Sequence, residues 1–129
     1  MKKANPVVAI VDDDPRLLES MENLLESAGY VPHSFSSAEA FIVSGLSNMD
    51  VIITDIGMPG MNGFELCDLM KRTRPELPVF LITGRHEKVE QGRTVGASGF
   101  FRKPFDARAL LAAVERVLDD RNKEGEHEA

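Results

Sequence analysis

The chain has few of the features that mark secreted, membrane-spanning or nucleic-acid-binding proteins. Cys67 is the one cysteine among 129 residues, so no internal disulfide can form and nothing indicates an oxidising compartment. Lys and Arg number 15 against 21 Asp and Glu, a formal net charge of -6 that disfavours binding to nucleic acid or anionic membranes. The apolar run at residues 7–11 is too short for a signal peptide or a membrane span. We therefore expect a cytoplasmic protein without membrane contact.

Short apolar runs predict the strands of the protein. Residues 7–11, 51–53 and 79–82 are rich in β-branched side chains and do not alternate with polar ones, which suits parallel strands covered on both faces. Weaker patterns predict two further strands over residues 31–35 and 99–102.

Segments with helical periodicity separate these strands. The first helix is expected to start at Pro15, after Asp14 as N-cap, and to end at Gly29. Its apolar stripe comprises Leu17, Met21, Leu24, Leu25 and Ala28. Ser36 and Glu39 have capping-box spacing and predict a second helix through residues 40–42.

Three more helices are predicted over residues 64–73, 88–95 and 106–120, with Cys67 as a core residue of the first of them. Five strands alternating with five helices predict an α/β fold: a doubly wound, flavodoxin-like parallel sheet of five strands in the order 2-1-3-4-5. We expect residues 1–120 to form one domain and residues 121–129 to form a flexible tail or a truncated linker.

Polar residues stand where four of the predicted strands end. In an open α/β sheet, ligands bind beyond the carboxyl ends of the strands, and the expected order makes strands 1, 3, 4 and 5 consecutive neighbours. The residues at these ends are Asp12, Asp13, Asp55, Thr83 and Lys103.

These residue types suit phosphoryl chemistry with a divalent cation. The carboxylates of Asp12, Asp13 and Asp55 would repel one another too strongly to stay ionised without a cation, and such oxygen ligands favour Mg²⁺. Asp55 can act as a nucleophile that forms an aspartyl phosphate, while Lys103 and the hydroxyl of Thr83 can stabilise the added oxygens.

Four segments of the chain stand out in order: Val-Asp-Asp-Asp at 11–14, Thr-Asp-Ile-Gly-Met-Pro-Gly at 54–60, Ile-Thr-Gly at 82–84 and Arg-Lys-Pro-Phe at 102–105. Together they resemble the receiver (CheY-like) family of two-component response regulators, and the resemblance covers nearly the whole chain. The last two segments are similar to receivers of the FixJ type.

The resemblance implies a role for each matching residue at the site. Asp55 would accept the phosphoryl group, and Thr83 and Lys103 would contact its oxygens. Asp13 would bind Mg²⁺ directly and Asp12 through water. The backbone carbonyl of Gly57 would supply a further ligand.

The resemblance also implies a conformational switch and two special backbone positions. Thr83 would move toward the phosphate while Phe100 turns inward, altering the face formed by helix 4, strand 5 and helix 5. The peptide before Pro104 would be cis and aim Lys103 at the site. Gly63 would be the turn glycine that permits a positive backbone angle before the third helix.

By the same resemblance, the protein is a signalling domain that catalyses only its own phosphoryl transfer and dephosphorylation. The expected partners are a sensor histidine kinase or histidine phosphotransfer protein and, after phosphorylation, a second copy of the chain. Any DNA contact would come from another domain.

Two other functions stay open at this point. The protein could be a phosphorylation-independent interaction module with a vestigial acidic pocket, or a Mg²⁺-dependent phosphohydrolase acting on outside substrates. Taken singly, Asp55 could form a turn, Lys103 could be a solvated side chain and Phe100 could simply pack in the core. A dinucleotide site is disfavoured, because three aspartates stand where a Gly-rich turn would be needed.

Overall fold

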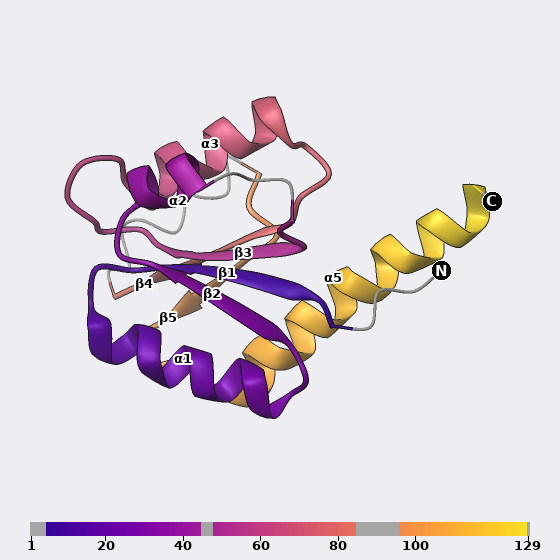
Figure 1. Ribbon diagram of the computed structural model, residues 1–129, viewed down its shortest axis with the longest axis horizontal. Coiled ribbons are helices and arrows are strands. Elements are labelled where there is room, and N and C mark those ends of the chain that lie inside the picture. Colours follow the sequence, from indigo (N-terminus) through magenta and orange to yellow (C-terminus); the bar gives the residue numbers. More distant parts are fainter. Residues whose placement is uncertain (1–4, 45–47, 85–95, 129) are drawn as a thin grey trace.

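The computed structural model describes residues 5–44, 48–84 and 96–128, in which strands alternate with helices as predicted as far as residue 84 (Figure 1). The elements are β1 (Val7–Val11), α1 (Pro15–Ser27), β2 (Val31–Phe35), α2 (Ala38–Ser44), β3 (Val51–Asp55), α3 (Gly63–Thr73), β4 (Val79–Thr83), β5 (Gly99–Arg102) and α5 (Ala107–Glu128). The helix predicted over residues 88–95 lies outside the described residues.

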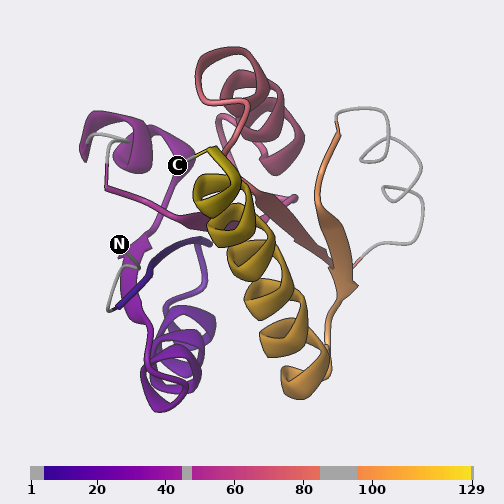
Figure 2. The same cartoon turned by 90° about the vertical axis from the view of Figure 1, so that its right-hand side faces the viewer.

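The five strands form one parallel sheet in the order β2-β1-β3-β4-β5, which confirms the predicted topology. Helices α1 and α5 cover one face of this sheet, and α2 and α3 cover the other (Figure 2). Every residue of β3 and of β4 is buried, as expected for central strands between two helical layers.

Alternating side chains divide the core into two clusters. In β1, Val8 and Ile10 pack toward α1 and α5, whereas Ala9 and Val11 pack toward α2 and α3. The buried helical residues on the first side are Met21, Leu25, Leu110 and Val114, and those on the second are Ala38, Phe41, Phe64, Leu66, Cys67 and Met70. The prediction that Cys67 is a core residue is confirmed.

Helix α1 begins as predicted, with Pro15 in its first turn and the Asp14 side chain accepting a hydrogen bond from the Arg16 N–H at 3.0 Å. Gly29 follows the helix with a φ of +92°. The placement of Ala28 on the buried stripe was wrong, because the helix ends at Ser27 and Ala28 is an exposed C-cap.

The capping box predicted for α2 was also wrong. The helix begins at Ala38, and the hydroxyl of Ser37, not Ser36, accepts a hydrogen bond from the Ala40 N–H at 3.0 Å. Two adjacent serines offer the same capping group, so their spacing alone does not choose between them. The carboxylate of Glu39 accepts a hydrogen bond from the Met61 N–H instead.

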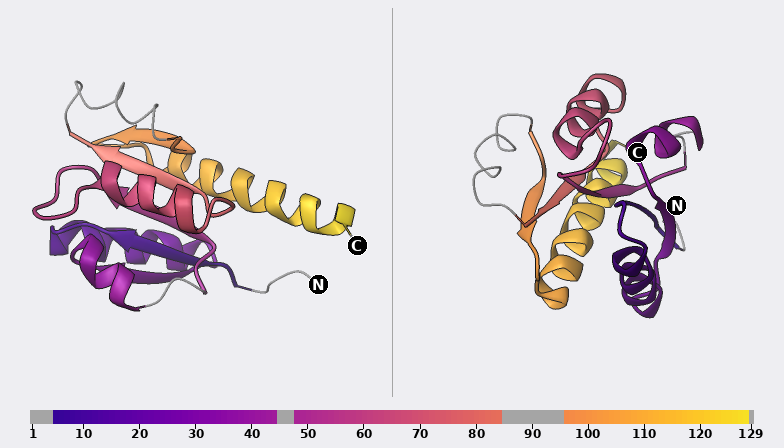
Figure 3. Two further views of the ribbon diagram at one scale, coloured as in Figure 1. Left: turned by 90° about the horizontal axis from the view of Figure 1, so that it is seen from above. Right: turned by 90° about the vertical axis from the view of Figure 1, so that its left-hand side faces the viewer.

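Helix α5 is longer than the predicted span of residues 106–120. The Asp106 carboxylate accepts a hydrogen bond from the Arg108 N–H at 2.9 Å just before the helix, which then continues to Glu128. Seen from above, its last turns extend beyond the sheet (Figure 3). That residues 121–129 serve as a tail or linker stays a prediction. Within the described ranges, no helix combines the length and apolar character needed to cross a bilayer.

Candidate functional site

Four strands carry polar side chains to one edge of the sheet. Asp12 follows β1, Asp55 ends β3, Thr83 ends β4 and Lys103 follows β5. Lys103 lies beside β4, because its N–H donates to the carbonyl of Thr83 at 2.9 Å. Asp12, Asp55 and Thr83 are 1%, 7% and 2% exposed, so three of the polar side chains at this edge are buried within an apolar fold.

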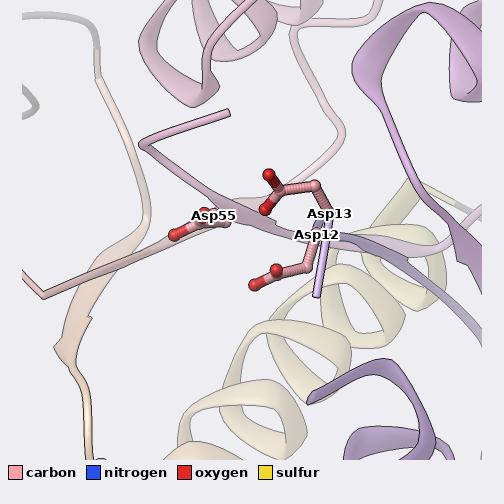
Figure 4. A group of neighbouring side chains, drawn as sticks. All are labelled: Asp12, Asp13 and Asp55. Carbon is pink, nitrogen blue, oxygen red and sulfur yellow. The ribbon is translucent and has the colours of Figure 1, made fainter. Parts of the chain in front are cut away.

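Three carboxylates meet at this edge (Figure 4). Asp12, Asp13 and Asp55 each offer an oxygen, and these oxygens all lie within 4.8 Å of one another. Asp13 is exposed while the other two are buried, so the cluster opens to solvent on the Asp13 side. The predicted convergence of these three residues is confirmed.

Both carboxylate oxygens of Asp12 accept hydrogen bonds. Oδ1 accepts a hydrogen bond from the Asp14 N–H at 2.8 Å, and Oδ2 accepts one from Lys103 Nζ at 3.3 Å. Burial and the nearby charge of Asp55 raise the pKa of Asp12, against the opposing effects of the Asp14 N–H and Lys103. Among the described residues, Lys103 is the cation in contact with this carboxylate.

Lys103 bridges the two buried carboxylates. Its Nζ lies 3.3 Å from Asp12 Oδ2 and 3.3 Å from Asp55 Oδ1. Burial alone would lower the pKa of Lys103, but the charges of Asp55 and Asp12 outweigh burial and raise this pKa. The Lys103–Pro104 peptide is cis, as predicted.

Thr83 and Phe100 occupy neighbouring strands beside the site. Asp55 pairs with Ile82 across β3 and β4, which places Thr83 one residue beyond the partner of the acidic residue. Phe100 pairs with Leu81, is half-buried and packs against the core cluster beneath α2 and α3. The switch role of these two residues stays a prediction.

Glycines shape the loop that follows Asp55, but not in the predicted way. Gly63 has no positive φ; the loop residue with one is Gly60, at +75°. Gly63 is required for a different reason, since a Cβ there would lie 2.4 Å from the backbone oxygen of Asp55. Gly57 is exposed, with nothing within 4 Å of an added Cβ, and its role as a carbonyl ligand stays a prediction.

Two contacts around this loop were not predicted from the sequence. Asn62 and Glu65 form a capping box at the start of α3: the Asn62 N–H donates to the Glu65 carboxylate and the Glu65 N–H donates to the Asn62 side chain, both at 2.9 Å. The Asn-x-x-Glu spacing before an apolar run is a local signal that could have revealed it. The bond from Met61 to Glu39 joins residues 22 positions apart and has no local signal.

The donor set fits a small, hard divalent cation. Three carboxylate oxygens lie close together, and Lys103 contacts two of the three carboxylates. Oxygen ligands of this kind are those that Mg²⁺ prefers. A cation would offset the repulsion among the clustered carboxylates.

Comparison with known proteins agrees with this geometry. The family model of the response regulator receiver domain matches residues 8–115. The chain is 34% identical over 124 residues to the transcriptional regulatory protein FixJ of Azorhizobium caulinodans, covering 94% of this chain and 59% of FixJ. It is 37% identical over 114 residues to the heme response regulator HssR of Staphylococcus epidermidis, covering 84% of this chain and 50% of HssR. The chain thus spans between half and about six tenths of these curated relatives.

Solved receiver structures match along nearly their whole length. A CheY-like receiver domain protein from Methanospirillum hungatei aligns with a TM-score of 0.86 at 28% identity, covering 93% of this chain and 98% of that one. The BeF3-activated DrrB receiver domain aligns with a TM-score of 0.83 at 33% identity, covering 89% and 98%. From its family match, its relatives and its acidic cluster, this chain belongs to the receiver domains of two-component response regulators.

Proposed function

We propose that Asp55 accepts a phosphoryl group from a phosphohistidine on a sensor histidine kinase or a histidine phosphotransfer protein. The observation that carries this proposal is the position of the Asp55 carboxylate, at the end of a buried central strand, 3.3 Å from Lys103 Nζ and grouped with Asp12 and Asp13. Of the three clustered carboxylates, it is the one at the end of the central strand β3, flanked by β1 and β4.

The transfer requires one bond to form and one to break. A carboxylate oxygen of Asp55 attacks the phosphorus, forming an acyl phosphate, while the phosphorus–nitrogen bond of the donor breaks. The bonding electrons stay on the donor ring nitrogen, and with one proton taken up by the ring from solvent the donor leaves as neutral histidine. Lys103 stabilises the negative charge on the phosphoryl oxygens, and the hydroxyl of Thr83 donates to one of them. Loss of the group to water regenerates Asp55, so the domain would catalyse only its own phosphorylation and dephosphorylation.

The residues suited to hold Mg²⁺ are the three aspartates together with the carbonyl of Gly57. Asp13 and Asp55 would bind the ion directly and Asp12 through water. When bound, the ion would neutralise charge on the phosphoryl oxygens. The clustering of the three carboxylate groups within 4.8 Å supports this assignment.

The output of phosphorylation would be a change in the surface near β5 and α5, driven by Thr83 and Phe100. Phe100 has no hydroxyl, so it would report the phosphorylated state through packing alone. The altered surface would bind a target or a second copy of the chain.

A location in the cytoplasm also stays a prediction.

Intact-mass measurement after incubation with acetyl phosphate and Mg²⁺ tests the proposal. We expect one added phosphoryl mass in the wild-type chain, dependent on Mg²⁺ and absent from Asp55→Asn. Asp50→Asn is a matched control, because Asp50 lies just before the other end of β3, and it should load normally. No addition under conditions that load another receiver would favour the phosphorylation-independent interaction module. Addition that persists in Asp55→Asn would mean that another residue is the acceptor.

A further inference from the structure

The loop between β3 and α3 carries the backbone carbonyl assigned to the metal, and it is tied down at both ends. At its start, the Ile56 N–H donates to the carbonyl of Ile82 at 2.9 Å, and the Gly63 N–H closes the loop by donating to the carbonyl of Ile56 at 3.1 Å. At its far end, Asn62 is the N-cap of α3. Gly57 lies between these anchors, in a stretch that also contains Gly60.

Glu39 supplies a further anchor to this loop from a different helix, at Met61 beside the N-cap Asn62. It lies in the first turn of α2, and its Oε2 accepts a hydrogen bond from the Met61 N–H at 2.9 Å. The same oxygen would lie 2.8 Å from a Cβ built on Gly60, so the carboxylate sits directly against the Gly60–Met61 backbone. Figure 1 shows the loop passing beside the start of α2.

The helix that carries Glu39 is firmly seated. Ala38 and Phe41, on either side of Glu39 in the sequence, are fully buried in the core, and the ring of Phe41 packs edge-on against that of Phe35 with centroids 5.3 Å apart. The hydrogen bonds from the Met61 N–H and from its own N–H lower the pKa of Glu39. Glu39 is therefore an ionised acceptor on a fixed support.

We propose that Glu39 is a positioning residue for the metal site: it holds the Gly60–Met61 backbone against α2 and thereby restricts the conformations open to the Gly57 carbonyl. This inference rests on the proposed function, which assigns that carbonyl to Mg²⁺. Glycines lose more conformational freedom on ordering than other residues, so a loop containing Gly57 and Gly60 would bind a cation weakly unless something ordered it beforehand. Outer contacts that orient a ligand commonly change metal affinity strongly.

The competing explanation is that Glu39 merely stabilises α2, as acidic side chains in a first helical turn do. Ser37 separates the two explanations. Its hydroxyl caps the same helix and, within the described residues, makes no hydrogen bond to the loop. Ser37→Ala therefore weakens α2 and leaves the loop contact intact. Glu39→Gln keeps an oxygen acceptor for the Met61 N–H, whereas Glu39→Ala removes it.

The test is calorimetric titration of Mg²⁺ alone into the wild-type chain and these three variants, together with hydrogen exchange of the Met61 amide. We expect Glu39→Ala to bind Mg²⁺ about threefold to tenfold more weakly, less than for a buried outer contact because Glu39 is exposed, and its Met61 amide to exchange faster. Glu39→Gln and Ser37→Ala should stay within about twofold of the wild-type affinity.

Wild-type Mg²⁺ affinity in Glu39→Ala would overturn the inference. An equal loss in Glu39→Gln would overturn it too, because charge and not the hydrogen bond would then be acting, and an equal loss in Ser37→Ala would assign the effect to helix stability. Failure of the proposed function is distinct: the wild-type chain itself would then neither bind Mg²⁺ nor load a phosphoryl group, whatever the state of the Met61 amide.

Discussion

Aspartates lie at both edges of the sheet, but their hydrogen bonds and neighbouring charges differ between the two edges. At the amino edge, Asp50 precedes β3: its carboxylate accepts a hydrogen bond from the Val7 N–H at 2.8 Å and its own N–H donates to the carbonyl of Val7 at 2.8 Å. The carbonyl of Asp50 accepts a further bond from Arg121 of α5 at 2.7 Å. At the carboxyl edge, three carboxylates crowd around Lys103.

We interpret the difference as one between an acid that stabilises the fold and acids proposed to hold the metal and the phosphoryl group. Asp50 joins β1, β3 and α5 through complementary hydrogen bonds, so its polar groups stabilise the fold. The acidic cluster instead lowers the stability of the fold, since burial and mutual repulsion disfavour the ionised form of Asp12. Local arrangements that cost stability are expected where a ligand or reaction later relieves them.

The largest expected effect is on Mg²⁺ binding at the carboxyl edge. Replacing the exposed Asp13 by Asn should weaken Mg²⁺ binding by about 10- to 100-fold, because a charged ligand is lost, while the fold stays intact. Asp50→Asn should leave the affinity unchanged. Calorimetric titration measures both. If Asp13→Asn bound Mg²⁺ as tightly as the wild type, Asp13 would not be a ligand, and metal binding would no longer distinguish the carboxyl edge from the amino edge.

A smaller effect is expected on stability at the amino edge. Asp50→Ala should lower the free energy of unfolding by about 1–2 kcal/mol, because the Val7 N–H loses its acceptor, and Arg121→Ala should lower it by about 1 kcal/mol. Urea denaturation without Mg²⁺ would measure these changes. Asp13→Asn is the control, since removing one of three clustered charges should not destabilise the chain. Equal destabilisation by that variant would break the comparison.

The smallest effect is a pH dependence that belongs to Asp12. Because the folded protein raises the pKa of Asp12 above its usual value of 3.8, this residue favours folding below about pH 4, and the benefit is lost as the pH rises through the higher folded pKa. Between pH 4 and 7, the wild-type chain should therefore lose stability relative to Asp12→Asn. Urea denaturation at both pH values, without and with Mg²⁺, would measure this. A difference that grew in the opposite direction would show that Lys103 more than neutralises the site.

Much of the fold could be predicted because its signals are local. Strands β1, β2 and β5 begin and end at the predicted residues: β1 is a run of β-branched and apolar side chains, while β2 and β5 were indicated by weaker patterns bounded by turns. The predicted strand order then placed Asp12, Asp55 and Lys103 at one edge, because parallel strands end on the same side of a sheet.

The predictions that failed depended on choices between equivalent neighbours or on close packing. Ser36 and Ser37 are chemically the same cap, and only the position of α2 selected Ser37. The need for glycine at position 63 was correct, but its cause is the approach of the Asp55 backbone and not a positive φ, which belongs to Gly60.

By itself, the sequence determined the strands, their parallel arrangement and the acidic character of one sheet edge, because hydrophobic periodicity and residue type act over short distances. Only the tertiary structure decided the contacts of Glu39 with Met61, 22 residues apart, and of Arg121 with Asp50, 71 residues apart. Such hydrogen bonds require the distance between donor and acceptor to be correct to within a few tenths of an ångström, and their angles depend on how the helices pack on the sheet. Periodicity determines which face of a helix is buried, but not where along the sheet its polar side chains come to lie.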